Sequence, residues 1–141
     1  MLLGAPGARE VDLSGADIAV VVDLGTGSGR MLTLFGKKAK MSVGLDLSQN
    51  MLNIARTNVT KAGVEQVELR HGDIFATRLP AASADLVIVH QVLHYLDDPA
   101  RALREAARLV APGGRLLVVD DAHLLDPLSA ALVYQLAAED A

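Results

Sequence analysis

Short apolar runs alternate with helical patterns along most of this chain, and that alternation limits the folds it can adopt. The continuous apolar run at 18–22 predicts a strand buried on both faces, and the runs at 86–89 and 116–119 are similar. A weaker strand is expected at 41–45. The stretch 67–71 alternates apolar and charged side chains, which is typical of a strand at a sheet edge with one solvated face.

Helical patterns fill the gaps between these runs. Ser48 is a candidate N-cap for one helix, and Asp98, followed by Pro99, is a candidate N-cap for another. A shorter helix is expected after Gly29, and a last helix over 127–138. The order β-α-β-α-β-α-β-α-β-α predicts a doubly wound parallel sheet, because right-handed crossovers place helices on both of its faces. Ligands of such sheets bind at the carboxyl ends of the strands.

A glycine-rich turn follows the first predicted strand. Alternate positions of D-L-G-T-G-S-G hold one carboxylate and three glycines, Asp23, Gly25, Gly27 and Gly29. Glycines let the backbone pass close to a ligand, and the helix that follows presents free N–H groups. A dinucleotide fingerprint, G-x-G-x-x-G, would need a third glycine where this chain has Arg30. The alternative interpretation is a tight turn that binds nothing.

Two further carboxylates follow the next two predicted strands. Asp46 ends the second strand, where a carboxylate can accept hydrogen bonds from both ribose hydroxyls of an adenosine group. The alternative is a capping role, since Ser48 is close. Asp73 follows the third strand and can accept a hydrogen bond from the adenine amino group, although Gly-Asp alone signals only a turn. Met51 and Ile74 are expected to sandwich the adenine ring.

These three sites, in this order, resemble those of class I S-adenosylmethionine-dependent methyltransferases. Two further segments, V-L-H-Y-L-D-D-P at 92–99 and L-V-A-P-G-G-R-L at 109–116, are similar to the branch that acts in ubiquinone and menaquinone biosynthesis. The resemblance covers about residues 18–121. It implies an α/β fold with a three-layer, doubly wound, Rossmann-like and mostly parallel sheet of about five strands in the order 3-2-1-4-5. It also implies S-adenosylmethionine as the cofactor and a small molecule as the methyl acceptor.

The resemblance implies roles for individual residues as well. Asp23 and Gly25 would lie near the methionine part of the cofactor, and His90 and Gln91 would border the sulfonium. Leu47 is assigned to the same cofactor site. Family members often align the acceptor with the methyl group without a dedicated acid or base, since proximity supplies most of the rate.

The histidines leave other interpretations open. His94 is a candidate general base, but we favour a packing role because nothing visible in the sequence orients its imidazole. A second hypothesis is metal-dependent hydrolysis of a phosphoester, with metal ligands drawn from His90, His94, Asp120, Asp121 and His123. Their spacing matches no tight metal-binding motif. A third hypothesis is a module that binds S-adenosylmethionine without transferring its methyl group.

Composition narrows the classes of partner. The 141 residues suit one domain, which we place at 16–141 after a flexible lead-in at 1–15. The net charge of −4 comes without a basic stripe, so neither nucleic acid nor an anionic membrane is indicated as a partner. The absence of cysteine excludes disulfides and thiolate zinc sites and fits a cytoplasmic location. No apolar run is long enough to span a membrane.

The C-terminal part departs from the resemblance. A complete class I methyltransferase has seven strands, and its last two form an antiparallel hairpin beside the fifth. Here the last stretch of the chain reads as one helix, so that hairpin is expected to be missing. The fifth strand would then be an exposed edge, and we predict that it pairs with a second copy to give a homodimer. Cover by the terminal helix and a truncated product with poor cofactor binding are the alternatives.

Overall fold

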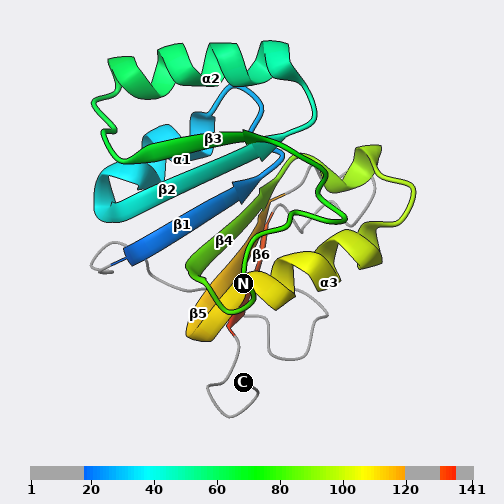
Figure 1. Ribbon diagram of the computed structural model, residues 1–141. Helices are drawn as coiled ribbons and strands as arrows, with labels where there is room; N and C mark the ends of the chain where they lie inside the picture. The colour runs from blue at the N-terminus through cyan, green and yellow to red at the C-terminus, as the bar shows by residue number, and fades with distance from the viewer. Residues whose placement is uncertain (1–17, 120–130, 136–141) are drawn as a thin grey trace.

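The computed structural model describes residues 18–119 and 131–135, which build a six-stranded sheet with helices on both faces (Figure 1). The strands are β1 (Ile18–Leu24), β2 (Ala39–Asp46), β3 (Val67–His71), β4 (Ala84–His90), β5 (Val110–Val119) and β6 (Ala131–Gln135). The helices are α1 (Arg30–Phe35), α2 (Gln49–Lys61) and α3 (Pro99–Leu109), with short 3-10 turns η1 (Gly36–Lys38) and η2 (Leu93–Tyr95).

The sheet has the order β3-β2-β1-β4-β5-β6. The first five strands are parallel, so the predicted doubly wound sheet with order 3-2-1-4-5 is confirmed. β3 lies at the outer edge, as its alternating pattern predicts. The order reverses at β1, where the chain crosses from β3 to β4, and a cleft for a ligand is expected at the carboxyl ends of the strands there.

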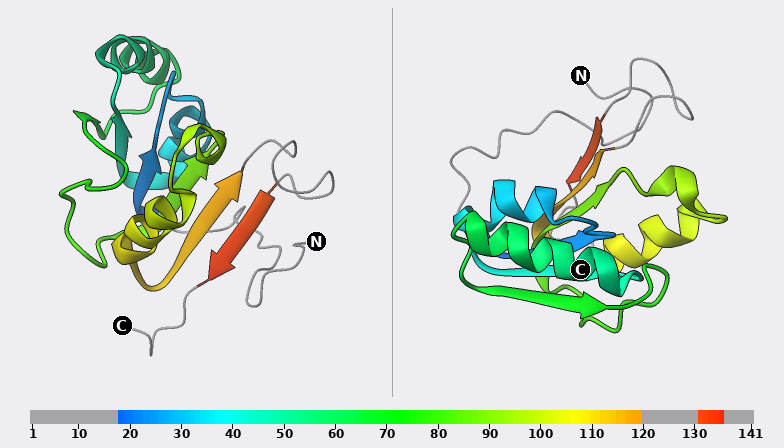
Figure 2. Two further views of the ribbon diagram at one scale, coloured as in Figure 1. Left: turned by 90° about the vertical axis from the view of Figure 1, so that its right-hand side faces the viewer. Right: turned by 90° about the horizontal axis from the view of Figure 1, so that it is seen from above.

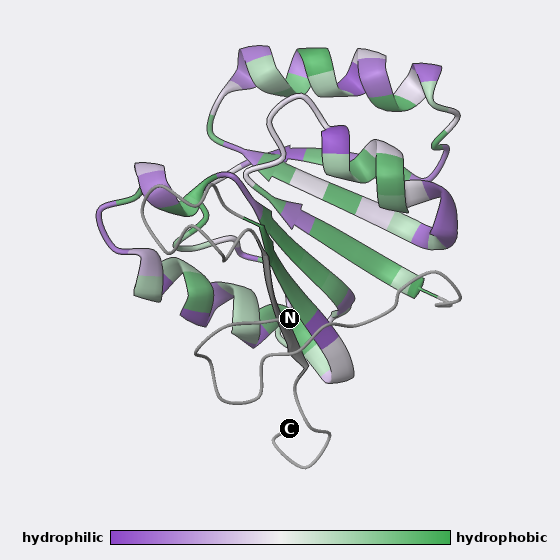
Figure 3. Ribbon diagram, turned by 180° about the vertical axis from the view of Figure 1, so that it is seen from behind, coloured by the Kyte–Doolittle hydropathy of each residue, from purple (hydrophilic) through white to green (hydrophobic). Residues whose placement is uncertain are grey.

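Two apolar clusters, one on each face, hold the layers together. α1 and α2 cover one face and α3 covers the other (Figure 1). Val21 and Ile88 belong to the cluster beneath α1 and α2, whereas Val22 and Val87 belong to the cluster that α3 completes. The central strands therefore bury both faces, which explains their continuous apolar sequences and their hydrophobic colouring in Figure 3.

The predicted helix starts are confirmed. Ser48 Oγ accepts a hydrogen bond from Met51 N at 3.2 Å, and Asp98 Oδ1 accepts one from Arg101 N at 3.1 Å. Each bond satisfies a backbone donor in the first helical turn, and Pro99 occupies the first position of α3.

Two expectations about the elements are wrong. The segment 72–83 connects β3 to β4 without a helix, because its backbone is tied to α3 by hydrogen bonds described below. In place of the helix expected at 127–138, residues 131–135 form β6, antiparallel to β5 (Figure 2). Residues 127–130 and 136–138 lie outside the described residues. Backbone hydrogen bonds with β6 satisfy the donors and acceptors of β5, which would stay open if 131–135 formed a helix. This pairing between distant segments therefore outweighs the local helical pattern.

The new strand changes the expected edge of the sheet. β6 pairs with β5 from Arg115 opposite Gln135 to Val119 opposite Ala131. β5 is therefore not an exposed edge, and the reason given for a homodimer no longer holds.

The predicted lead-in at 1–15 lies outside the described residues. In the described ranges, no helix combines the length and apolar character needed to cross a membrane.

Candidate functional site

An open cleft with about 360 Å³ of empty space lies where the sheet order reverses. It is lined by residues at or just after the carboxyl ends of strands: Gly25, Leu45, Asp46, Leu47, Gly72, Ile74, Val92 and Leu96. Its lining is mostly apolar with one carboxylate, as is usual for sites that bind small molecules.

The glycine turn supplies backbone rather than side chains to this cleft. Gly25, Gly27 and Gly29 have φ angles of +70°, +54° and +81°, a region that other residues enter only at a cost. A Cβ on Gly25 would lie 3.0 Å from Cγ2 of Val92, so a side chain at Gly25 would fill part of the cleft. From α2, Asn58 Nδ2 donates to the turn at Ser28 O, 2.8 Å away.

Asp46 joins the turn to the second strand. Its Oδ2 accepts a hydrogen bond from Gly27 N at 2.8 Å, and its Oδ1 accepts one from Ser48 N at 2.9 Å. Each carboxylate oxygen has two lone pairs and retains capacity for a ligand hydroxyl. The N-cap of α2 is Ser48 and not Asp46. Asp46 instead lines the cleft, and its contact with the ribose hydroxyls stays a prediction.

Asp23 is buried behind the turn, with 1% of its surface exposed. Its Oδ2 accepts a hydrogen bond from Thr26 Oγ1 at 2.8 Å, whereas Oδ1 has no partner in the part of the chain that the structure describes. The pKa of Asp23 is raised to about 7, mainly by burial; the Thr26 hydrogen bond opposes this shift and the nearby Asp46 charge adds to it. Asp23 is not in the cleft lining and its unpartnered oxygen is itself buried, so a contact with the methionine part of the cofactor stays a prediction.

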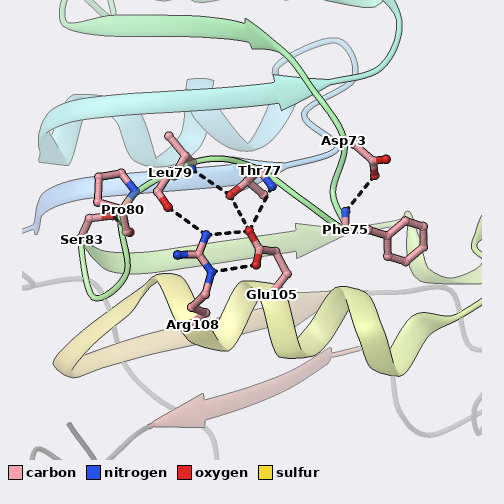
Figure 4. Close-up of polar contacts among 8 residues, drawn as sticks. All are labelled: Asp73, Phe75, Thr77, Leu79, Pro80, Ser83, Glu105 and Arg108. Atoms are coloured by element: carbon pink, nitrogen blue, oxygen red, sulfur yellow. Dashed lines mark hydrogen bonds and ion pairs between the residues drawn. The ribbon is translucent and has the colours of Figure 1, made fainter.

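Asp73 lies between two residues of the cleft lining, Gly72 and Ile74, but its own side chain is exposed and is not part of that lining. Its Oδ1 accepts a hydrogen bond from Phe75 N at 2.9 Å (Figure 4). Gly72 N donates to Asp46 O at 3.0 Å, so the ends of β2 and β3 are held together. The two predicted carboxylates therefore follow adjacent strands beside one cleft.

The other predicted cofactor residues take different places. Leu47 lines the cleft with 64% of its surface exposed. Met51 borders the glycine turn, since its Cε is 3.7 Å from the position of a Cβ on Gly27. His90 ends β4 and is not in the cleft lining. His94 lies in η2 with its ring 4.0 Å from that of Tyr95, at 42°.

From the segment after β4 sequence reasoning assigned Gln91 and His94 but missed Val92 and Leu96. Val92 and Leu96 both line the cleft, and Gln91, with φ +56°, donates from its backbone N to Val119 O at 2.6 Å. Their position directly after a central strand was the available signal.

The described residues contain no group of three or more His, Asp and Glu side chains that could hold a metal ion. Three of the hypothetical metal ligands lie outside these residues, namely Asp120, Asp121 and His123. Nothing found supports the hydrolase alternative.

The geometry defines the class of this protein. A doubly wound sheet with a glycine turn after β1 and carboxylates after β2 and β3 is the Rossmann-like arrangement that the sequence resemblance implies. The chain belongs to the methyltransferase domain family, which matches residues 22–118. This match confirms the resemblance to class I S-adenosylmethionine-dependent methyltransferases, and with it S-adenosylmethionine as the cofactor of the family.

Individual relatives agree with this assignment. The uncharacterised methyltransferase YcgJ of Bacillus subtilis is 30% identical over 108 residues, which are 77% of this chain and 43% of YcgJ. Its crystal structure has a TM-score of 0.70 over 76% of this chain and 46% of its own, at 28% identity. The demethylmenaquinone methyltransferase of Listeria monocytogenes serotype 4a is 40% identical over 77 residues, 55% of this chain and 32% of that enzyme.

A second protein of known structure is named for the cofactor. The S-adenosylmethionine-dependent methyltransferase of Aquifex aeolicus has a TM-score of 0.64 and 28% identity, covering 72% of this chain and 56% of its own. The chain thus spans less than half the length of the two sequence relatives.

Proposed function

We propose that this chain binds S-adenosylmethionine in the cleft and that the protein transfers its methyl group to a small-molecule acceptor. The observation that carries the proposal is the position of Asp46, which lines the cleft while its carboxylate holds the glycine turn through Gly27 N. A bound adenosyl group would find glycine backbone on one side and the apolar walls of Leu47 and Ile74 on the other.

Each part of the ligand has a residue suited to it. The Asp46 carboxylate accepts from the ribose hydroxyls, and Asp73, next to Ile74, accepts from the adenine amino group. The resemblance assigns Asp23 and Gly25 to the methionine part. Gly25 lines the cleft, whereas Asp23 is buried behind the turn and supports it through Thr26. His90 and Gln91 border the sulfonium.

When bound, the cofactor supplies an electrophilic methyl group on sulfur. The residues of this chain contribute position rather than acid–base chemistry, because in-line transfer is accelerated mainly by proximity and alignment. Val92 and Leu96 present an apolar wall after β4, which suits an apolar or aromatic part of a small acceptor. His94, whose ring packs at a tilt against that of Tyr95, is kept as a packing residue, with a general-base role as the alternative.

Calorimetric titration with S-adenosylmethionine and S-adenosylhomocysteine tests the binding step. The proposal requires saturable binding of both ligands, and absence of binding to either one would reject it. A radiolabelled methyl-transfer assay with a panel of quinones, phenols and other small acceptors tests the transfer step. Binding without product across the panel would favour the non-catalytic module instead.

A further inference from the structure

The segment 72–83 connects β3 to β4 and is held against α3 by hydrogen bonds at several points (Figure 4). At its end, Ala82 N donates to Arg108 O and Ser83 N donates to Leu109 O, both at 2.9 Å. These bonds use carbonyls that the last turn of α3 would otherwise leave open. The segment matters for the site because it begins with the residues that line the cleft.

The Glu105 carboxylate is the centre of this attachment. Its Oε2 accepts hydrogen bonds from Thr77 N at 3.0 Å and from Thr77 Oγ1 at 2.7 Å. Arg108 donates to both Glu105 oxygens at 2.8 Å, and its Nη2 also donates to Leu79 O at 2.8 Å. The Glu105 side chain is only 12% exposed. Hydrogen bonds from Arg108, and then from Thr77, lower the pKa of Glu105 to about 2.

A strained residue lies between the two attached positions. Arg78 has φ +64°, a left-handed conformation that a residue with a side chain adopts only at an energetic cost. Such a conformation persists only where the surroundings fix it. Here Glu105 holds Thr77 on one side and Arg108 holds Leu79 on the other.

A tight turn connects the attached segment to the cleft. Ala76 N donates to Asp73 O at 3.0 Å, and Phe75 N donates to Asp73 Oδ1 at 2.9 Å. The guanidinium of Arg101 on α3 lies 4.9 Å from the centroid of the Phe75 ring. Thr77 follows this turn directly, so the position of Asp73 depends on where α3 holds Thr77.

We propose that Glu105 is a positioning residue for adenine recognition: through Thr77 and Arg108 it fixes the 72–83 segment so that Ile74 and Asp73 are held at the cleft. This inference rests on the proposed binding of S-adenosylmethionine. Glu105 itself is not in the cleft lining. Its contribution is to preorganise residues that contact the ligand, which reduces the ordering required on binding.

Thr77 and Glu105 can be altered with little change in side-chain size. Glu105→Gln removes the charge. Thr77→Val replaces the hydroxyl by a methyl group, which removes its bonds to Glu105 and from Leu79 N, and Thr77→Ser keeps the hydroxyl. Glu65→Gln is the matched control, because Glu65 is an exposed carboxylate just before β3. Affinity is measured by calorimetry for S-adenosylhomocysteine, adenosine and purine riboside, which lacks the 6-amino group.

The expected result is a loss of selectivity for the amino group. In Glu105→Gln and Thr77→Val, affinity for S-adenosylhomocysteine and the preference for adenosine over purine riboside should each fall about fivefold, the size expected for one weakened hydrogen bond. Thr77→Ser and Glu65→Gln should keep the wild-type values. Far-ultraviolet circular dichroism and thermal unfolding identify variants that are folded at the titration temperature.

Three results would overturn the inference. Unchanged selectivity in folded Glu105→Gln and Thr77→Val, with wild-type binding intact, rejects the role of Glu105 and leaves the proposed function standing. Equal losses for adenosine and purine riboside indicate a general effect on the fold. Failure of the wild type to bind S-adenosylhomocysteine rejects the proposed function and this inference together.

Discussion

Asp46 Oδ2 accepts a hydrogen bond from the backbone N of Gly27 at 2.8 Å, which joins the tip of β2 to the turn after β1. The other oxygen of the same carboxylate holds Ser48 N, at the start of α2. One side chain therefore fixes the glycine turn, the end of a strand and the beginning of a helix around the cleft. A ligand hydroxyl would meet a carboxylate that is already oriented, which favours binding.

The first prediction concerns this carboxylate. Asp46→Ala should weaken S-adenosylhomocysteine binding at least tenfold, because hydrogen bonds to a charged group contribute about 1.5–3 kcal/mol each and the glycine turn also loses its anchor. Calorimetric titration measures the change. Unchanged affinity would show that the ribose assignment is wrong.

Asp85 provides a matched control for Asp46. Its Oδ2 also accepts two backbone hydrogen bonds, from Ala19 N at 3.1 Å and Val20 N at 2.9 Å, but near the amino end of β4. Asp85→Ala should lower stability and leave the affinity for S-adenosylhomocysteine unchanged. Equal affinity losses in both variants would indicate that damage to the sheet, and not the loss of a ligand contact, weakens binding.

The second prediction separates backbone strain from obstruction of the cleft. Gly25 and Gly113 have similar φ angles, +70° and +80°, so alanine at either position should destabilise the fold by about 1–2 kcal/mol. A Cβ on Gly25 meets Val92 at 3.0 Å, whereas a Cβ on Gly113 has no atom within 4 Å. Urea unfolding should show similar losses, and only Gly25→Ala should also lose S-adenosylhomocysteine binding. Normal binding by Gly25→Ala would mean that the ligand does not approach this turn.

Much of the site could be predicted because its signals are local in sequence. Continuous apolar runs identify strands with two buried faces, and the residue after each such strand lies at the ligand-binding edge of the sheet. Four residues that the sequence assigns in this way or by resemblance line the cleft: Gly25, Asp46, Leu47 and Ile74.

Other features depend on contacts between distant segments. The 131–135 segment has a short apolar pattern that fits a helix or a strand, and pairing with β5 decides the outcome. Thr77 and Glu105 are 28 residues apart, and no local pattern shows that one holds the other. The unpartnered oxygen of Asp23 is likewise visible only once the neighbouring segments are packed around it.

The third prediction concerns the edge that β6 covers. Deleting residues 131–141 removes this strand and leaves the donors and acceptors of β5 exposed, so the shortened chain should associate as its concentration rises. Size-exclusion chromatography with light scattering measures the mass. Deleting only residues 136–141 is the control, because it keeps β6 and should leave the mass as in the full chain. A constant mass for the longer deletion would show that β5 does not depend on β6 for protection.

The fourth prediction follows from the buried Asp23 carboxyl. In the folded chain its pKa is raised from the usual 3.8 to about 7, mainly by burial, with the Thr26 hydrogen bond opposing the shift and the Asp46 charge adding to it. Between these values the folded chain binds more protons than the unfolded chain, so this group lowers the free energy of unfolding as pH rises from about 4 to about 7. Above about pH 7 both states are ionised and the penalty is constant.

Asp23→Asn removes this titration and keeps an oxygen that can accept the Thr26 hydrogen bond. The stability of the variant relative to the wild type should therefore increase steadily between about pH 5 and pH 7 and level off at higher pH. Urea unfolding of both proteins across this range measures the difference, and titrations common to both cancel in the comparison. Parallel profiles for the two proteins would show that Asp23 is already ionised in the folded chain at about pH 5, with its charge stabilised by groups outside residues 18–119.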